Sequence, residues 1–101
     1  MDLQKLQQEI YQNKVNRGFN VTDVGKEIVL MAEELGELAR AYKNSNKLPA
    51  RETDQRDEMI DAAGDLMVYC LGLCEMLEVN SEDVLRQIVE DHKRRSHTGW
   101  M

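Results

Sequence analysis

Two clusters of carboxylates are the residues of this chain whose types and spacing could do chemistry. Their members are Glu33, Glu34 and Glu37 in the first cluster and Glu58, Asp61 and Asp65 in the second. Side chains three or four residues apart share one face of a helix, and like charges at that spacing cost about 0.2–0.5 kcal/mol per pair. Carboxylates buried without partners cost far more. Basic neighbours are too few to compensate, which favours a divalent cation held by carboxylate oxygens over a solvated acidic face.

The segments around both clusters have the periodicity of helices that face a core. We expect the first of these helices to run from a cap at Thr22 or Asp23 to about residue 44, and the second to run from a cap at Thr53 or Asp54 to about residue 77. The apolar stripe expected to be buried in the first consists of Val24, Ile28, Met31, Leu35, Leu38 and Tyr42.

Two further helices are predicted at the ends of the chain. The first spans residues 2 to about 16 with Asp2 as its cap, and the last begins at a cap on Ser81. Their expected buried residues are Leu3, Leu6, Ile10 and Val15 in the first and Val84, Leu85, Ile88 and Val89 in the last. Four helices joined by loops, the longest around residues 44–49, predict an all-α four-helix bundle, and such bundles hold metal and ligand sites between facing helices.

Length and charge limit the classes of function. A chain of 101 residues is expected to form one domain, residues 1–101, with a non-periodic tail at 96–101. Its core would be small, so we expect it to be completed by oligomerisation. The net charge of −6 argues against non-specific nucleic-acid binding. The polar amino terminus and the lack of an apolar run of about 20 residues predict neither a signal peptide nor a membrane span. The expected location is the cytoplasm.

Three other residues were weighed as functional candidates. Cys70 and Cys74 lie one helical turn apart, and we interpret them as small buried apolar residues in a reduced compartment rather than as a redox or zinc pair. Phe19 follows a glycine in a connection between helices. Its ring is either a surface on which a nucleobase stacks or an anchor packed on the core.

Residues 34–37 (ELGE) and 58–61 (EMID) resemble the ExxE…ExxD signature of the all-α nucleoside triphosphate pyrophosphohydrolases. This MazG-like superfamily includes MazG, the dimeric dUTPases and the dCTP pyrophosphatases. The similarity covers about residues 15 to 95. In a second registration Asp65 is the aspartate of the motif, and Ala62 then stands where relatives have glutamate. Relatives often carry an asparagine with lysine and arginine on the last helix, whereas residues 91–95 (DHKRR) lack it.

The resemblance implies Mg²⁺-dependent hydrolysis of a nucleoside or deoxynucleoside triphosphate to the monophosphate and pyrophosphate, with Mn²⁺ as an alternative ion. It also implies a homodimer or homotetramer. The implied metal ligands are Glu34, Glu37, Glu58, Asp61 and Asp65. A carboxylate not fully used as a ligand could orient the attacking water, for which Glu33 and Glu34 are the candidates. The implied substrate-binding residues are Lys93, Arg94 and Arg95, together with Phe19, and Lys14 and Arg17 are less favoured candidates for binding phosphate.

Three alternatives remain open from the sequence. The first is the related phosphoribosyl-ATP pyrophosphohydrolase, which residues 62–66 (AAGDL) resemble. The second is a non-catalytic helical interaction module whose acids are solvated or hold a structural metal. The third is a di-iron bundle, which the lack of histidine near the acidic motifs disfavours because such sites use Glu-x-x-His pairs. The basic segment at residues 93–95 has its own alternative, a cationic helix end favoured by the helix dipole.

Overall fold

A computed structural model describes residues 1–45 and 52–95 of the chain, and within these it contains four helices and no strand. The helices are α1 (Leu3–Asn16), α2 (Val24–Ser45), α3 (Glu52–Met76) and α4 (Ser81–Arg94). The prediction of an all-α protein with four helices is confirmed. The expected tail at 96–101 and most of the expected loop at 44–49 lie outside the described residues, although α2 itself extends to residue 45.

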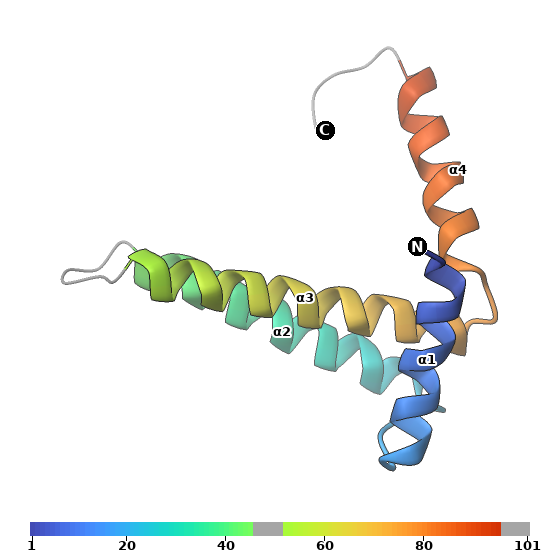
Figure 1. The fold of residues 1–101 in the computed structure, drawn as a ribbon, viewed down its shortest axis with the longest axis horizontal. Coiled ribbons are helices and arrows are strands. Elements are labelled where there is room, and N and C mark those ends of the chain that lie inside the picture. Colours follow the sequence, from blue (N-terminus) through green and yellow to red (C-terminus); the bar gives the residue numbers. More distant parts are fainter. Residues whose placement is uncertain (46–51, 96–101) are drawn as a thin grey trace.

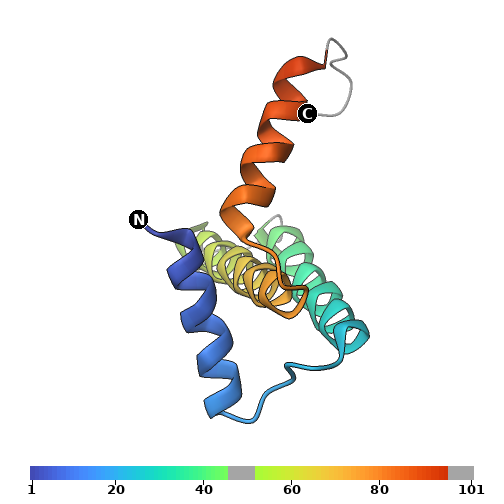
Figure 2. The same ribbon diagram turned by 90° about the vertical axis from the view of Figure 1, so that its right-hand side faces the viewer.

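The long helices α2 and α3 lie side by side as an antiparallel hairpin (Figure 1). The shorter α1 crosses the hairpin near the carboxyl end of α3, which it contacts, and α4 leaves that same end and projects away from the hairpin (Figures 1 and 2). Between α2 and α3 the small residues Ala41 and Ala62 are buried. Their size lets the two helices approach closely.

Three of the four helix starts can be compared with the predicted caps. The Asp2 side chain accepts a hydrogen bond from the Lys5 backbone N–H (3.0 Å), and Asp23 accepts one from the N–H of Lys26 (3.1 Å), so both predicted caps are confirmed. At α4 the cap is Asn80, whose Oδ1 accepts from the N–H of residue 82 (2.9 Å). The prediction of Ser81 was wrong by one residue because serine and asparagine cap equally well.

The start of α3 also differs from its prediction. The helix begins at Glu52, ahead of Thr53 and Asp54, which therefore lie within its first turn rather than at its cap. The residue before Glu52 is outside the described part of the chain. Helix ends assigned from hydrogen bonding shift by one or two residues in any case, so this correction does not move the acidic cluster on α3.

The buried side of α1 is polar, which the sequence analysis did not expect. Gln7 and Lys14, one heptad apart, are its buried residues, whereas Leu6 and Val15 of the predicted stripe are exposed. The Gln7 side chain does not make a hydrophobic contact here. It forms hydrogen bonds with backbone groups of the connection between α3 and α4. Its Nε2 donates to the Val79 carbonyl oxygen (2.8 Å) and to a carboxylate oxygen of Glu75 (2.9 Å), and its Oε1 accepts from the N–H of residue 81 (2.8 Å).

The predicted apolar stripes of α2 and α4 are also largely exposed. On α2 the exposed members are Ile28, Leu35 and Tyr42, and on α4 they are Leu85, Ile88 and Val89. The buried side of α2 instead carries Glu27, with 1% of its surface exposed. The stripes were identified correctly as apolar, but none of the four described helices covers them, because α4 projects away from the hairpin (Figure 1).

Candidate functional site

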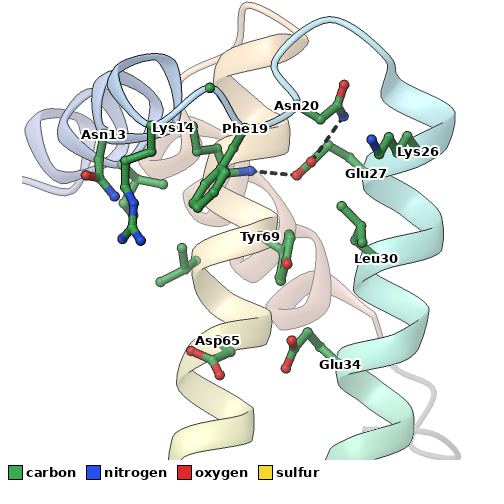
Figure 3. Close-up of a pocket in the computed structure, with 14 residues that line it drawn as sticks. Asn13, Lys14, Phe19, Asn20, Lys26, Glu27, Leu30, Glu34, Asp65 and Tyr69 are labelled. Atoms are coloured by element: carbon green, nitrogen blue, oxygen red, sulfur yellow. Dashed lines mark hydrogen bonds and ion pairs between the residues drawn. The ribbon is translucent and has the colours of Figure 1, made fainter.

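A groove runs along one face of the α2–α3 hairpin and consists of two cavities that share Asp65. The larger cavity, of about 730 Å³, lies between α1, α2 and α3 (Figure 3), and the smaller, of about 280 Å³, lies nearer the closed end of the hairpin. The α3 residues lining the two cavities are Glu58, Asp61, Ala62, Asp65, Val68 and Tyr69. This spacing of three and four places them on one helix face, so the two cavities are continuous along the helix.

The larger cavity has a mixed lining, in which aromatic and apolar side chains lie beside polar and charged ones. Phe19 and Tyr69 lie on opposite sides of it, with Leu30 on the α2 wall (Figure 3). Phe19 is 51% exposed, so its interpretation as an anchor buried in the core was wrong. The Arg17 guanidinium stacks on the Phe19 ring at 4.9 Å from its centroid, which stiffens the ring at the cavity mouth.

A glycine turn presents Phe19 to this cavity. Gly18 has φ +71°, in the left-handed region that glycine adopts without a Cβ penalty. The N–H of Phe19 donates to the Lys14 carbonyl oxygen (2.9 Å) and the N–H of Gly18 to that of Val15 (3.2 Å). These two bonds form a Schellman motif that ends α1, and the residue after the glycine is thereby directed toward α3.

A buried ion pair joins α1 to α2 in the lining of the larger cavity. The Lys14 Nζ lies 2.6 Å from the Glu27 Oε2, and their side chains are only 8% and 2% exposed. Asn20 donates to the other oxygen of Glu27 (3.2 Å), and the Lys14 ammonium lies 5.1 Å from the ring centroid of Tyr69 (Figure 3). The paired charges are hydrogen-bonded on both sides, as a buried pair requires.

Gly72 makes room for this pair. A Cβ at this position would lie 2.7 Å from the Lys14 Nζ and 3.1 Å from its Cε. The lysine can therefore cross α3 only where the helix has no side chain. The pair was not predicted from the sequence. The available signal was a lysine and a glutamate at positions surrounded by helix-core residues, together with a glycine inside the most apolar helix.

Glu34 lies on the α2 wall of the larger cavity, level with Asp65, the residue that the two cavities share (Figure 3). One oxygen of its carboxylate, Oε2, is buried without a hydrogen-bond partner. Burial raises the pKa of Glu34 above its ordinary value, and repulsion from Glu37 and Asp65 raises it further. Burial, followed by the charges of Glu34, Glu27 and Asp65, raises the pKa of the Tyr69 hydroxyl. The site therefore carries an uncompensated negative charge.

The carboxylates of the groove are side chains of the type that binds a divalent cation. An unpartnered carboxylate oxygen beside other carboxylates is the donor set that hard cations prefer. Within residues 1–45 and 52–95, no three His, Cys, Asp or Glu side chains converge on a single point. Mg²⁺ is commonly bound by one or two carboxylates while water and substrate phosphates supply its remaining ligands, so a partial set is compatible with that ion.

The groove brings together six of the predicted site residues. Five are carboxylates and one is aromatic, and they are Glu34, Glu37, Glu58, Asp61, Asp65 and Phe19. Four cations also line the groove: Lys14, Arg17 and Lys26 in the larger cavity and Arg40 in the smaller one. Lys14 and Arg17 were less favoured phosphate-binding candidates from the sequence, whereas Lys26 and Arg40 were not selected as site residues.

Four predicted site residues do not line the groove. Glu33 is exposed on α2 and lines neither cavity. Lys93 and Arg94 lie at the end of α4, far from the hairpin face (Figure 1), and form ion pairs within that helix, with Glu90 (3.3 Å) and Asp91 (4.0 Å). Arg95 directly follows the helix. Within one chain this basic segment is a cationic helix terminus.

Neither of the two cysteines lines the groove. Both are free thiols, Cys70 is exposed and Cys74 is partly buried, so the expectation that both are buried was wrong for Cys70. Burial, followed by the neighbouring Cys70, raises the pKa of the Cys74 thiol. A thiol with a raised pKa is a weak nucleophile at neutral pH.

A family model for phosphoribosyl-ATP pyrophosphohydrolase matches residues 3–92. No curated protein and no solved structure matches the chain. None of the described helices is both long and apolar enough to cross a membrane. The matched family belongs to the all-α MazG-like superfamily, whose members generally depend on a divalent metal. The match spans most of the chain and all of the groove, and the chain therefore belongs to the phosphoribosyl-ATP pyrophosphohydrolase family, as a pyrophosphohydrolase that acts on a nucleotide.

Proposed function

We propose that the protein hydrolyses a nucleoside or deoxynucleoside triphosphate to the monophosphate and pyrophosphate in a Mg²⁺-dependent reaction. The observation that carries this proposal is the unpartnered Glu34 oxygen, buried where an aromatic cavity meets a groove lined by carboxylates. A nucleotide has the complementary layout, with a planar base at one end and phosphates that bring metal ions at the other.

The groove carboxylates are the proposed cation ligands. Glu34, Glu37 and Asp65 lie closest to the junction of the cavities, and Glu58 and Asp61 continue the set along α3. A bound Mg²⁺ would offset their repulsion, neutralise phosphate charge and lower the pKa of a bound water. Mn²⁺, which also takes oxygen ligands, is the expected substitute.

The remaining groove residues have roles that follow from their positions. Phe19 and Tyr69 offer aromatic faces to a base, and Leu30 and Val68 exclude water from the interior of the cavity. Glu34 is the better candidate for orienting the attacking water, because it lines the groove whereas Glu33 lines neither cavity. Glu33 would serve only if the substrate extended beyond the groove.

The basic end of α4 requires a second copy to reach a phosphate. Lys93, Arg94 and Arg95 lie away from the groove of their own chain (Figure 1), and the exposed apolar residues of α4 and α2 would be covered in an oligomer. We therefore keep the homodimer or homotetramer as part of the proposal. Sedimentation of the purified protein tests it, and a monomer at micromolar concentration would remove these three residues from the site.

The experiment that tests the proposed function is pyrophosphate release from a panel of canonical and modified nucleoside triphosphates, with Mg²⁺, with Mn²⁺ and with EDTA. Glu34→Gln and Glu37→Gln are the test variants, and Glu9→Gln, on the exposed side of α1, is the matched control. Metal-dependent release that both test variants lose and the control keeps is the expected result. A rise in melting temperature with Mg²⁺ but no release from any substrate would indicate a non-catalytic module.

Phosphoribosyl-ATP is the second candidate substrate, and one observation favours it over a simple triphosphate. Arg17 and Lys26 line the larger cavity together with Phe19, and neither forms an ion pair with a carboxylate in the described part of the chain. Phosphoribosyl-ATP carries a second phosphate on the far side of its adenine, which these cations could bind. Turnover of this compound that Arg17→Gln and Lys26→Gln both impair would establish it as the substrate.

A further inference from the structure

The two ends of the groove differ in size and in charge, and this difference gives a bound nucleotide a direction. The larger cavity has room for a nucleoside and is lined by Phe19, Leu30, Val68 and Tyr69, together with charged side chains that include Lys14, Arg17 and Lys26. The smaller cavity, less than half that volume, is lined by four carboxylates, two alanines and one cation, Arg40. Its lining offers no aromatic ring to a base.

Arg40 is the residue of the smaller cavity that has no evident structural purpose. It lies on α2 three residues after Glu37 and lines the smaller cavity together with Asp61 and Asp65 of α3. In the part of the chain that the structure describes, no carboxylate lies within ion-pair distance of its guanidinium. A guanidinium presents a fork of N–H donors that matches two oxygens of a phosphate, and here this fork is available.

We propose that Arg40 binds the leaving pyrophosphate in the smaller cavity, while the nucleoside occupies the larger one and the cleaved bond lies at Asp65. This inference rests on the proposed function and adds the direction of the substrate and a substrate-binding residue. Water supplies an oxygen to one phosphorus, the bridging oxygen leaves on the other, and the two protons of water pass to the products or to solvent. Arg40 takes no part in that transfer and binds the charge of the departing group.

The reverse orientation is less well supported by the lining residues. If the pyrophosphate lay beside Arg17 and Lys26, the base would have to enter the smaller cavity. There it would displace water from the carboxylates, and its own N–H groups would be weaker hydrogen-bond donors to them than the water it replaces. The carboxylates at the junction hold cations on either orientation. Phe19 lines only the larger cavity and Arg40 only the smaller one, and their substitution therefore tests the direction.

The test is the binding of products, measured by calorimetry in the presence of Mg²⁺. Pyrophosphate and a set of nucleoside monophosphates (AMP, GMP, CMP, UMP and dTMP) are titrated separately into the wild type, Arg40→Gln and Phe19→Ala. Lys43→Gln is the matched control, since Lys43 is an exposed cation on the same helix and lines neither cavity. Thermal melts of each variant verify that it folds.

Arg40→Gln is expected to weaken pyrophosphate binding about tenfold or more and to leave the monophosphates unchanged. Phe19→Ala should weaken the binding of the monophosphates and leave pyrophosphate binding unchanged. Lys43→Gln should change the binding of neither product. The proposal is overturned if Arg40→Gln leaves pyrophosphate binding intact, if Phe19→Ala is the variant that weakens it, or if the wild type does not bind pyrophosphate. Because binding needs no turnover, a failure of the hydrolase proposal appears separately, as product binding without release of pyrophosphate from any triphosphate.

Discussion

Replacing Lys14 by methionine leaves a buried carboxylate without its counter-ion, and the size of the loss can be estimated from the structure. The Lys14 and Glu27 side chains are 8% and 2% exposed, which places the pair among buried ion pairs rather than surface ones. Removing one member of a buried pair costs about 3–5 kcal/mol, whereas an exposed pair is worth about 0–1 kcal/mol. A domain of this size has a free energy of unfolding of about 5–15 kcal/mol, so Lys14→Met should remove a large part of it.

The double variant Lys14→Met/Glu27→Leu separates two effects on stability: the cost of leaving Glu27 charged without a partner, and the loss of the attraction between the two charges. Replacing both charges by apolar residues of similar volume is often neutral or stabilising. Asn20 would lose Glu27 as an acceptor but would keep its hydrogen bond to the Asp23 carbonyl oxygen (2.8 Å). We therefore expect the double variant to recover most of the stability that Lys14→Met loses.

Urea unfolding followed by circular dichroism, at one fixed protein concentration, measures both effects. A fixed concentration is needed because an oligomer is stabilised by mass action. A loss of less than about 1 kcal/mol in Lys14→Met would refute the assignment of a buried pair. A double variant as unstable as the sum of the two single variants would show that the two charges act independently.

Three further predictions concern backbone geometry and pH. Gly72→Ala should destabilise by about 1–3 kcal/mol, because its Cβ would lie 2.7 Å from the Lys14 Nζ; in the Lys14→Met background the urea midpoint should change much less. Gly18 and Glu78 both adopt a positive φ (71° and 59°), which glycine tolerates better than any other residue. Gly18→Ala should therefore destabilise the protein by about 1 kcal/mol, and Glu78→Gly should stabilise it by a similar amount. The urea midpoints of the two variants should shift in opposite directions, and shifts in the same direction would contradict the prediction. The folded-state pKa of Glu34 is raised above 4.5, so ionisation of this carboxyl opposes folding, and the metal-free protein should lose stability as pH rises above that value. In EDTA at pH 7, Glu34→Gln should therefore melt at a higher temperature than the wild type, and its melting temperature should respond less to added Mg²⁺. A lower melting temperature for Glu34→Gln at that pH would count against an unpartnered charge on Glu34.

The sequence determined the local features of this protein. Helices were predictable because their apolar residues recur with the helical period, and the caps at Asp2 and Asp23 because a side chain bonds a backbone N–H only a few residues away. The acidic face of α3 was predictable for the same reason, since Glu58, Asp61 and Asp65 share one side of any regular helix. None of these features depends on what the helix packs against.

Burial was decided only by the tertiary structure. A polar residue such as Gln7 or Lys14 is buried because backbone groups or an opposite charge on another helix satisfy it, and nothing within its own helix records that partner. Ile28 and Leu85 were expected in the core because they are apolar, yet α4 projects away and leaves them exposed.

The site divides in the same way. Its carboxylates followed from their spacing along two helices, and the family from the motif they form. The groove itself, the junction at Glu34 and the position of Arg40 at one end of it depend on how α2 lies against α3. Short-range periodicity fixes which side chains share a face, whereas only the packing of helices far apart in sequence fixes which faces meet.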